Sequence, residues 1–200
     1  EFSQTWRNIA QSFKKPRLVI VISAHWVTKH LKVLADEQPR TIYDFYYFPK
    51  ELYEVEYAAP GSPECAAKIS ELTGAQLDSS WGFDHGAWTL LNHMYPERDV
   101  KVLQLSISYP SSPQELFEIG KKLQALRYEA LIIGSGNIVH NLRKADFRYE
   151  GGYTWAEKYD KMITESIINR DFNKILGFDK IHESRLAFPT LEHFQHLLYI

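Results

Sequence analysis

The chain has 200 residues, 44% of them hydrophobic and 14% aromatic, which fits one domain of ordinary size with a sizeable core. Its formal net charge is −2 and no basic stripe is present, which argues against nucleic acid as a partner. No apolar run approaches the roughly 18 residues that a membrane span requires. The single cysteine, Cys65, excludes an internal disulfide and a cysteine-rich zinc site, and favours the reducing cytoplasm.

The first half of the chain alternates helical and extended patterns. Apolar residues at helical spacing predict an amphipathic helix over residues 2–14, which Pro16 ends. The continuous β-branched run 18–22 predicts a strand covered on both faces. Residues 43–64 are aromatic, punctuated by prolines and not periodic, and predict a long loop of the kind that often carries function. Helices are expected near 63–73 and in the segment that ends before Pro96.

The second half continues the alternation. The patterns predict strands over 100–107 and 131–134, a helix over 113–127 that Ser112 and Pro113 begin, and helices over 155–170 and 190–199. Strands that alternate with helices predict an α/β fold, with a mainly parallel or mixed central sheet flanked by helices. No repeat, low-complexity segment or internal linker interrupts residues 1–200, so we expect one domain.

Two of the predicted strands lead into a histidine. His25 follows the run 18–22, and His140 follows 131–134 by way of the sequence GSGN. Ligands of α/β sheets bind beyond the carboxyl ends of the strands, and imidazole serves as a metal ligand or a proton carrier. Either histidine could instead be a hydrogen-bonded core or helix-capping residue. GSGN lacks the spacing of a nucleotide-binding loop, so we expect a tight strand-to-helix turn there.

Two further segments place polar residues in or near helices. In FDHGAW, Asp84 is a candidate helix cap and His85 is either a substrate contact or a structural residue. In TLEHFQH, His193 and His196 share one helix face, so either could bind a metal, and Glu192 lies beside them. The remaining histidines have polar or helical contexts and are treated as structural or solvated: His30, His93 and His182. The residues alone indicate a histidine-rich metal site and leave the reaction open.

A series of short motifs occurs in order along nearly the whole chain: SAHW, YDFYYFP, APGSPE, WGFDHGAW, HMYP, VLQLSI, GSGNIVHNLR and PTLEHF. Together they resemble the class III extradiol ring-cleavage dioxygenases, and within that family the DOPA-type group. The resemblance implies a catalytic domain that opens a catechol-type ring with O2 at a non-haem metal. Its partners would be a small aromatic diol and O2, and the oligomeric state is left open.

The resemblance also implies roles for individual residues. His25 of SAHW and His193 of PTLEHF match metal ligands, with Glu192 or His196 as alternative ligands. His140 of GSGNIVHNLR matches the catalytic acid/base. His85 matches a catalytic histidine beside the substrate, and the matched motifs make Tyr46, Asp84 and Asn137 candidate substrate-binding residues.

The implied cofactor is Fe(II), on nitrogen and oxygen ligands with open positions. The implied product is a muconic semialdehyde, formed when the ring opens next to the diol. Zn(II) could occupy the same histidines in a purified sample, where it would supply no redox chemistry. Two other functions are compatible with the same ligands: a zinc-dependent hydrolase that activates water, and a metal-binding relative without activity.

The sequence departs from the family pattern in two respects. The family begins with a GHGSP-like segment that carries a first metal-ligand histidine and ends with a further strand, and both are expected to be missing from residues 1–200. In YDFYYFP, Tyr47 stands where the family usually has glycine, which we expect to narrow the pocket or to reshape that loop.

Overall fold

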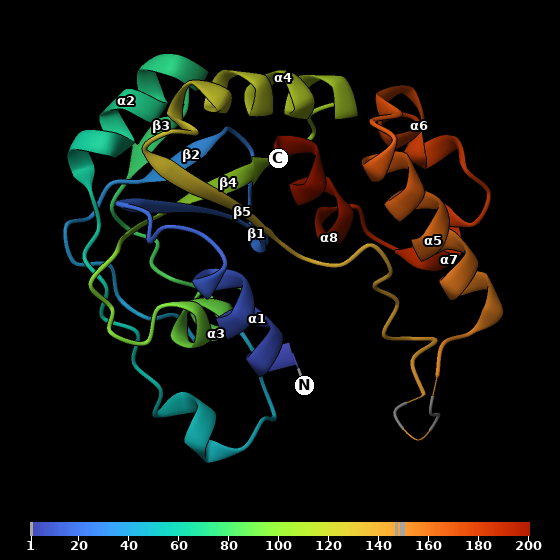
Figure 1. The fold of residues 1–200 in the computed structure, drawn as a ribbon, viewed down its shortest axis with the longest axis horizontal. Helices are drawn as coiled ribbons and strands as arrows, with labels where there is room; N and C mark the ends of the chain where they lie inside the picture. Colours follow the sequence, from blue (N-terminus) through green and yellow to red (C-terminus); the bar gives the residue numbers. More distant parts are fainter. Residues whose placement is uncertain (1, 147, 149–150) are drawn as a thin grey trace.

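The computed structural model describes residues 2–146, 148 and 151–200. Within these residues five strands form one sheet in the order β3-β2-β4-β1-β5 (Figure 1). Their bounds are Leu18–Thr28 (β1), Lys32–Leu34 (β2), Gln76–Asp78 (β3), Lys101–Ser108 (β4) and Ala130–Ser135 (β5). β1 pairs in parallel with β4 and β5, β2 pairs in parallel with β3, and β2 is antiparallel to β4. This mixed sheet confirms the predicted α/β fold.

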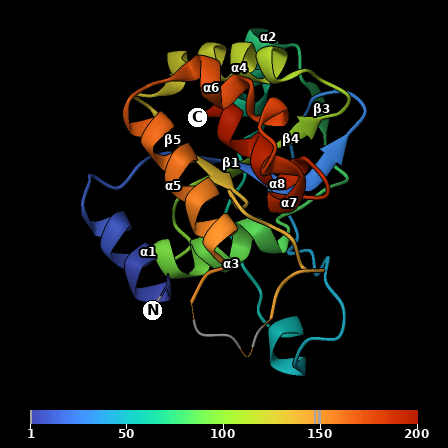
Figure 2. The same ribbon diagram turned by 90° about the vertical axis from the view of Figure 1, so that its right-hand side faces the viewer.

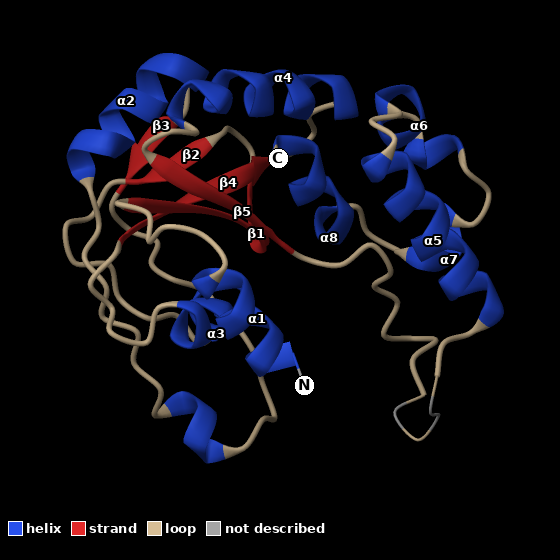
Figure 3. Cartoon of the chain, in the orientation of Figure 1, coloured by secondary structure: helices blue, strands red, loops and turns tan. Residues whose placement is uncertain are grey.

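Helices cover both faces of the sheet (Figure 3). One face carries α2 (Pro63–Thr73) and α4 (Pro113–Leu123), and the other carries α1 (Phe2–Gln11) and α3 (His85–Met94). A second group of helices lies to one side of the sheet, with α8 (Glu192–Gln195) nearest to it (Figure 1), and this group faces the viewer in Figure 2. That group also contains α5 (Thr154–Ile168), α6 (Phe172–Leu176) and α7 (Ser184–Ala187). No helix among the described residues combines the length and apolar character needed to cross a bilayer.

The core is built on alternate side chains of β1. Leu18, Ile20 and Ile22 pack in one apolar cluster with residues of α2 and α4. Val19 and Val21 pack in a second cluster, with residues of α1 and α3. Because both faces of the strand are buried, its sequence is a continuous β-branched run rather than an alternating one, and the predicted two-sided burial is confirmed.

Several expected boundaries differ from the observed ones. The first helix ends at Gln11, and the predicted helix 190–199 is the short α8 followed by the 3₁₀ helix η4 (His196–Tyr199). The strand-to-helix turn predicted at GSGN is wrong, because the next helix after β5 begins only at Thr154. β2, β3, α6 and α7 were not predicted, since segments of three to five residues are too short to show a period. The remaining 3₁₀ helices are η1 (Lys50–Tyr53), η2 (Gln124–Leu126) and η3 (Phe178–Lys180).

Two helix starts agree with their predicted caps. Ser112 caps α4 in a capping box with Glu115, and Pro113 takes the first helical position. Asp84 caps α3, where its side chain accepts a hydrogen bond from the N–H of Ala87. These caps fix where each helix begins, and α3 begins at His85.

The end of β1 has an irregular register. Ile22 pairs with Leu105 of β4 and the next paired residue is Val27, with Ile107, so four residues of β1 stand opposite one of β4. On the other side, the register with β5 ends at Ser23 and Ser135. Bulges of this kind often occur next to functional sites, where they redirect a side chain. His25 therefore lies inside β1, not after it as predicted, in a stretch free of regular pairing.

Asp78, at the end of β3, provides a pH-dependent test of the sheet edge. Its carboxylate is nearly buried and lies 2.6 Å from Nζ of Lys32 in β2. Burial raises its pKa, but the Lys32 ammonium and hydrogen bonds from Ser80 and Trp81 outweigh this and hold the pKa at about 2. Asp78→Asn should lower the free energy of unfolding by about 1–2 kcal/mol at pH 7.

Because the folded pKa is depressed, the contribution of Asp78 is fully present above the unfolded pKa of about 4 and is lost as pH falls towards 2. Urea unfolding of both proteins from pH 7 down to the lowest pH at which they fold measures this. A stability difference that stays constant below pH 4 would contradict the assignment.

Candidate active site

Four histidines from distant parts of the chain converge at the carboxyl edge of β1 and β5. The ring centroids of His25 and His85 lie 3.9 Å apart, and those of His25 and His193 lie 5.3 Å apart. The ring of His140 stacks on that of His193 at 3.4 Å and 12°. The expectation that His25 and His140 reach one edge of the sheet is thus confirmed, and His193 of α8 stands between them.

A buried carboxylate holds α3 against the sheet. Asp84 is fully buried and accepts hydrogen bonds from Ser23 Oγ of β1 at 2.7 Å and from Gln104 Nε2 of β4 at 2.7 Å. Burial raises the pKa of Asp84, and these bonds oppose that rise. The prediction that Asp84 binds substrate is wrong, because its side chain has no exposed surface; its alternative role as a helix cap is confirmed.

The glycine of the DHG motif allows α3 to approach the strand ends closely. A Cβ on Gly86 would lie 2.4 Å from Ser23 Oγ and 3.0 Å from Cδ2 of His25. Ser135 Oγ of β5 donates a hydrogen bond to the carbonyl of Gly86 at 2.6 Å. The neighbouring strands β1 and β5 therefore both contact the first turn of α3, and this places His85 beside His25.

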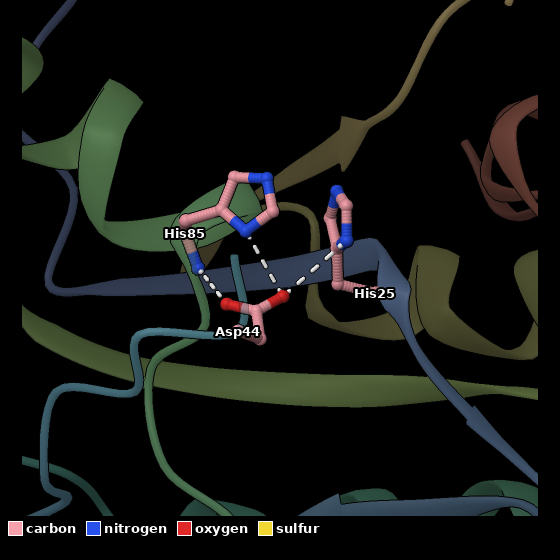
Figure 4. Close-up of side chains that lie close together, drawn as sticks. All are labelled: His25, Asp44 and His85. Carbon is pink, nitrogen blue, oxygen red and sulfur yellow. Dashed lines mark hydrogen bonds and ion pairs between the residues drawn. The ribbon is translucent and has the colours of Figure 1, made fainter. Parts of the chain in front are cut away.

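Asp44, in the aromatic loop, joins His25 and His85 (Figure 4). Its Oδ1 accepts a hydrogen bond from the backbone N–H of His85 at 2.8 Å. Its Oδ2 lies 2.9 Å from Nδ1 of His85 and 3.3 Å from Nδ1 of His25. The three side chains could together hold a metal ion, since one ligand atom from each lies within 4.8 Å of the others.

No role was predicted for Asp44, although it lies in the YDFYYFP motif. The available signal was an isolated carboxylate in a long aromatic loop, and metal-binding histidines commonly pair with a carboxylate. Burial raises the pKa of Asp44, but the hydrogen bonds from His85 outweigh it and leave the pKa below its usual value.

Burial keeps the central imidazoles neutral. Burial, and then the neighbouring His85, lower the pKa of His25 to about 4, against the opposing charge of Asp44. Burial, followed by His140 and His25, lowers the pKa of His193 to about 3. Nδ1 of His193 is buried and has no hydrogen-bond partner among the described residues. Neutral imidazoles with available lone pairs beside a carboxylate are a suitable donor set for a divalent metal.

The alternative ligands lie differently. The ring of His196 packs against the GSG turn, where a Cβ on Gly134 would be 2.5 Å from its Cδ2 and one on Gly136 would be 2.4 Å from its Nδ1. His196 therefore explains why this turn contains glycines. Glu192 is half-buried and accepts a hydrogen bond from Thr190 Oγ1 at 2.6 Å. The metal-capable group contains neither residue.

The remaining predicted substrate contacts are exposed. The side chain of Asn137 is exposed, while its N–H donates to the carbonyl of His193 at 2.8 Å and ties the turn to α8. Tyr46 is 78% exposed. Tyr47 has a φ of 64°, the left-handed conformation that favours glycine, and its side chain is fully exposed, so it does not narrow a pocket. Phe45 instead turns inward and packs edge-to-face on His85 with ring centroids 5.4 Å apart.

A cavity of 280 Å³ borders His140. Its lining includes the apolar side chains of Leu142, Tyr153 and Trp155. Two larger hollows, of 670 and 800 Å³, lie along residues 38–60 and at the amino ends of β1 and β4, and none of the four converging histidines lines them. Of these three hollows, the cavity beside His140 is the one that reaches the histidine cluster, and it does so through His140 alone.

Comparison with known sequences supports one family. The family described as "Catalytic LigB subunit of aromatic ring-opening dioxygenase" matches residues 1–200. The chain is 36% identical over 208 residues to "4,5-DOPA dioxygenase extradiol" of Escherichia coli K12, covering 100% of this chain and 77% of that protein. It is 37% identical over 202 residues to the protein of the same name from Beta vulgaris, covering 97% and 75%.

A solved structure has the same fold. The crystal structure of an uncharacterized protein from Escherichia coli K12 superposes with a TM-score of 0.84 at 32% sequence identity. The match covers 100% of this chain and 80% of that chain. The arrangement of sheet and flanking helices is thus shared with a solved structure over the full length described above.

Gly86 tests whether close packing of α3 assembles the cluster. In Gly86→Ala the new methyl group would overlap Ser23 Oγ and press on the ring of His25. Although alanine is the better helix former, we expect a loss of about 1–3 kcal/mol of unfolding free energy from this overpacking. Urea unfolding measures the loss. Gly177→Ala, where the nearest atom would be 3.1 Å from the Cβ, serves as the comparison and should lose less stability; equal effects in the two variants would rule out a special role for Gly86.

Proposed function

The chain belongs to the LigB family of aromatic ring-opening dioxygenases and is an extradiol ring-cleaving dioxygenase, and on that basis we propose that it opens a catechol at an Fe(II) ion held by His25 and His193. The observation that carries the proposal is the convergence of four histidine rings at one place. Within this group the buried Nδ1 of His193 has no hydrogen-bond partner among the described residues. Its substrates are an aromatic compound and O2, and the narrower identification of a small aromatic diol belongs to the proposal.

The donor set supports the metal assignment. His25 and His193 come from a central strand and from α8, and their rings lie 5.3 Å apart with an interplanar angle of 87°. Burial keeps both neutral, so neither has to lose a proton before it binds a cation. When bound, non-haem Fe(II) supplies the redox chemistry towards O2 and lowers the pKa of a phenol that it binds.

We assign Asp44 to orientation and not to metal binding. Its Oδ1 is already engaged by the backbone N–H of His85, and its Oδ2 faces Nδ1 of two rings. A histidine ligand commonly pairs its second nitrogen with a carboxylate in this way. His25 belongs both to the metal-capable group with Asp44 and His85 and to the pair with His193. It is therefore a ligand in either arrangement.

His140 is the proposed acid/base. Its ring stacks on His193, and its backbone N–H donates to the carbonyl of Ala187 at 2.7 Å, which fixes the loop that carries it. Burial lowers its pKa against the opposing charge of Glu192, so the neutral ring predominates at neutral pH and is ready to accept a hydroxyl proton. The protonated imidazole of His140 can then return the proton as the aromatic ring of the substrate opens.

His85 is proposed to contact the substrate beside His25. Phe45, packed on His85, supplies an aromatic surface that limits the access of water to that side of the site. We retain Tyr46 and Asn137 as proposed substrate contacts because both side chains are exposed. The printed name of the relatives makes DOPA the first catechol to test. The single cysteine, Cys65, supports a reducing compartment such as the cytoplasm.

The proposal is tested by oxygen uptake. The protein is loaded anaerobically with Fe(II) or Zn(II), and catechol, protocatechuate or DOPA is added with O2. Ring cleavage requires uptake with Fe(II) and none with Zn(II), because zinc has no redox chemistry. Zinc-dependent hydrolysis without oxygen uptake would favour a hydrolase. Metal binding without turnover of any catechol would favour a binding protein.

His140 and His25 should separate proton transfer from metal binding. His140→Ala should retain iron and lose about 10²- to 10⁴-fold in turnover, the usual contribution of a general acid/base. His25→Ala should lose the iron itself. His30→Ala, at an exposed position, is the matched control and should retain both. Iron content and oxygen uptake are measured for all three. The assignment fails if His140→Ala empties the site of iron or turns over at the parent rate.

A further inference from the structure

We propose that Asp44 is a positioning residue that holds His25 and His85 in one tautomer, with the proton of each neutral ring on Nδ1. The consequence for catalysis rests on the proposed function: both rings would then present an unprotonated Nε2, His25 towards the metal and His85 towards the substrate. The tautomers themselves follow from the contacts of Asp44 and require neither metal nor turnover.

The orientation of the Asp44 carboxylate is fixed by a contact that does not involve the imidazole rings. Its side chain is 17% exposed, and its Oδ1 accepts the hydrogen bond of 2.8 Å from the backbone N–H of His85. That N–H belongs to the first residue of α3, so the start of a helix orients the carboxylate. With Oδ1 engaged, Oδ2 is the atom that faces the imidazoles.

One oxygen serves two rings. Oδ2 lies 2.9 Å from Nδ1 of His85 and 3.3 Å from Nδ1 of His25, and the two ring centroids are 3.9 Å apart. A carboxylate has no proton to donate at neutral pH and can only accept. Both are ion-pair distances, and Nδ1 of His85 makes no hydrogen bond of regular geometry among the described residues. An unprotonated Nδ1 this close would still set its lone pair near that oxygen, so we place the proton of each ring on Nδ1.

The free nitrogens follow from this arrangement. A neutral imidazole with its proton on Nδ1 has its lone pair on Nε2. In Figure 4 the second nitrogen of each ring points away from Asp44, and the two point in the same general direction. A single carboxylate thus prepares a metal ligand and a substrate contact together, and loss of that carboxylate should disturb both.

Nitrogen NMR on protein labelled with ¹⁵N-histidine reads the tautomers directly. Long-range ¹H–¹⁵N spectra of the metal-free and zinc-loaded protein at pH 8 distinguish protonated from unprotonated ring nitrogens. His25→Gln and His85→Gln assign the two rings among the eight histidines. We expect Nδ1–H for both rings in the parent protein. Nε2–H on either ring would overturn the proposal.

Asp44→Asn supplies the second readout. The asparagine amide can donate a hydrogen bond to Nδ1 of one ring, and that ring must then carry its proton on Nε2. We expect one or both rings to leave the Nδ1–H form, and affinity for Zn(II), measured by chelator competition, to fall about 10- to 100-fold. Unchanged spectra with unchanged zinc affinity would make Asp44 merely structural. Complete loss of zinc binding would make it a direct ligand, and either result overturns the inference.

Tyr43→Phe is the matched control in the same loop. It removes the hydrogen bond of 2.8 Å from Tyr43 Oη to the carbonyl of Val55 and leaves Asp44 in place. It should preserve both the tautomers and the zinc affinity. Since no readout depends on oxygen uptake, a parent protein with the expected tautomers that turned over no catechol would refute the proposed function and leave this inference standing.

Discussion

The buried carboxylate of Asp84 is the contact on which the assembly of the site depends. A charge in the core is tolerated only when hydrogen bonds replace its lost hydration, and Asp84 receives them from Ser23 of β1, Gln104 of β4 and Ala87 of α3. Three elements are therefore locked at one point, directly before His85. His25, His85 and His193 stand on a strand and two helices, and hydrogen bonds tie the loops of Asp44 and His140 to the neighbouring structure, which preorganises the reactive groups.

Crowding of the imidazoles has an electrical effect as well as a geometrical one. His85 and His140 oppose protonation of His25, and His140 and His25 oppose protonation of His193, so His25 and His193 stay neutral where isolated histidines would be partly protonated. Asp44 adds one negative charge on the side of His25 and His85. The neutral rings of His25 and His193, with a carboxylate nearby, can bind a cation without first releasing protons.

The parts of this arrangement that follow from local pattern could be predicted. The apolar runs gave β1, β4 and β5, and parallel pairing of neighbouring strands accounts for the nearness of His25 and His140. The contact of Asp44 with two histidines could not be predicted, because it depends on how a long non-periodic loop folds back over β1. The burial of Asp84 could not be predicted either, because a helix-capping residue has the same sequence pattern whether its side chain faces the solvent or the core. Residue patterns alone indicated only a histidine-rich metal site, and the individual roles of His25, His140 and His193 were predicted from the family resemblance.

The position of β1 between β4 and β5 delays its pairing while the chain is being synthesised. Leu18 pairs with Lys101 on one side and with Ala130 on the other, so β1 leaves the ribosome well before either partner strand exists. Contacts between residues this far apart in sequence slow folding, because a long loop must close before they form. Meanwhile the run from Val19 to Ile22, β-branched, uncharged and free of proline, has the composition of an aggregating segment. Nascent chains of this protein should therefore depend on chaperones that cover exposed strands, and folding yield, more than final stability, should limit how much is recovered from a crowded cell.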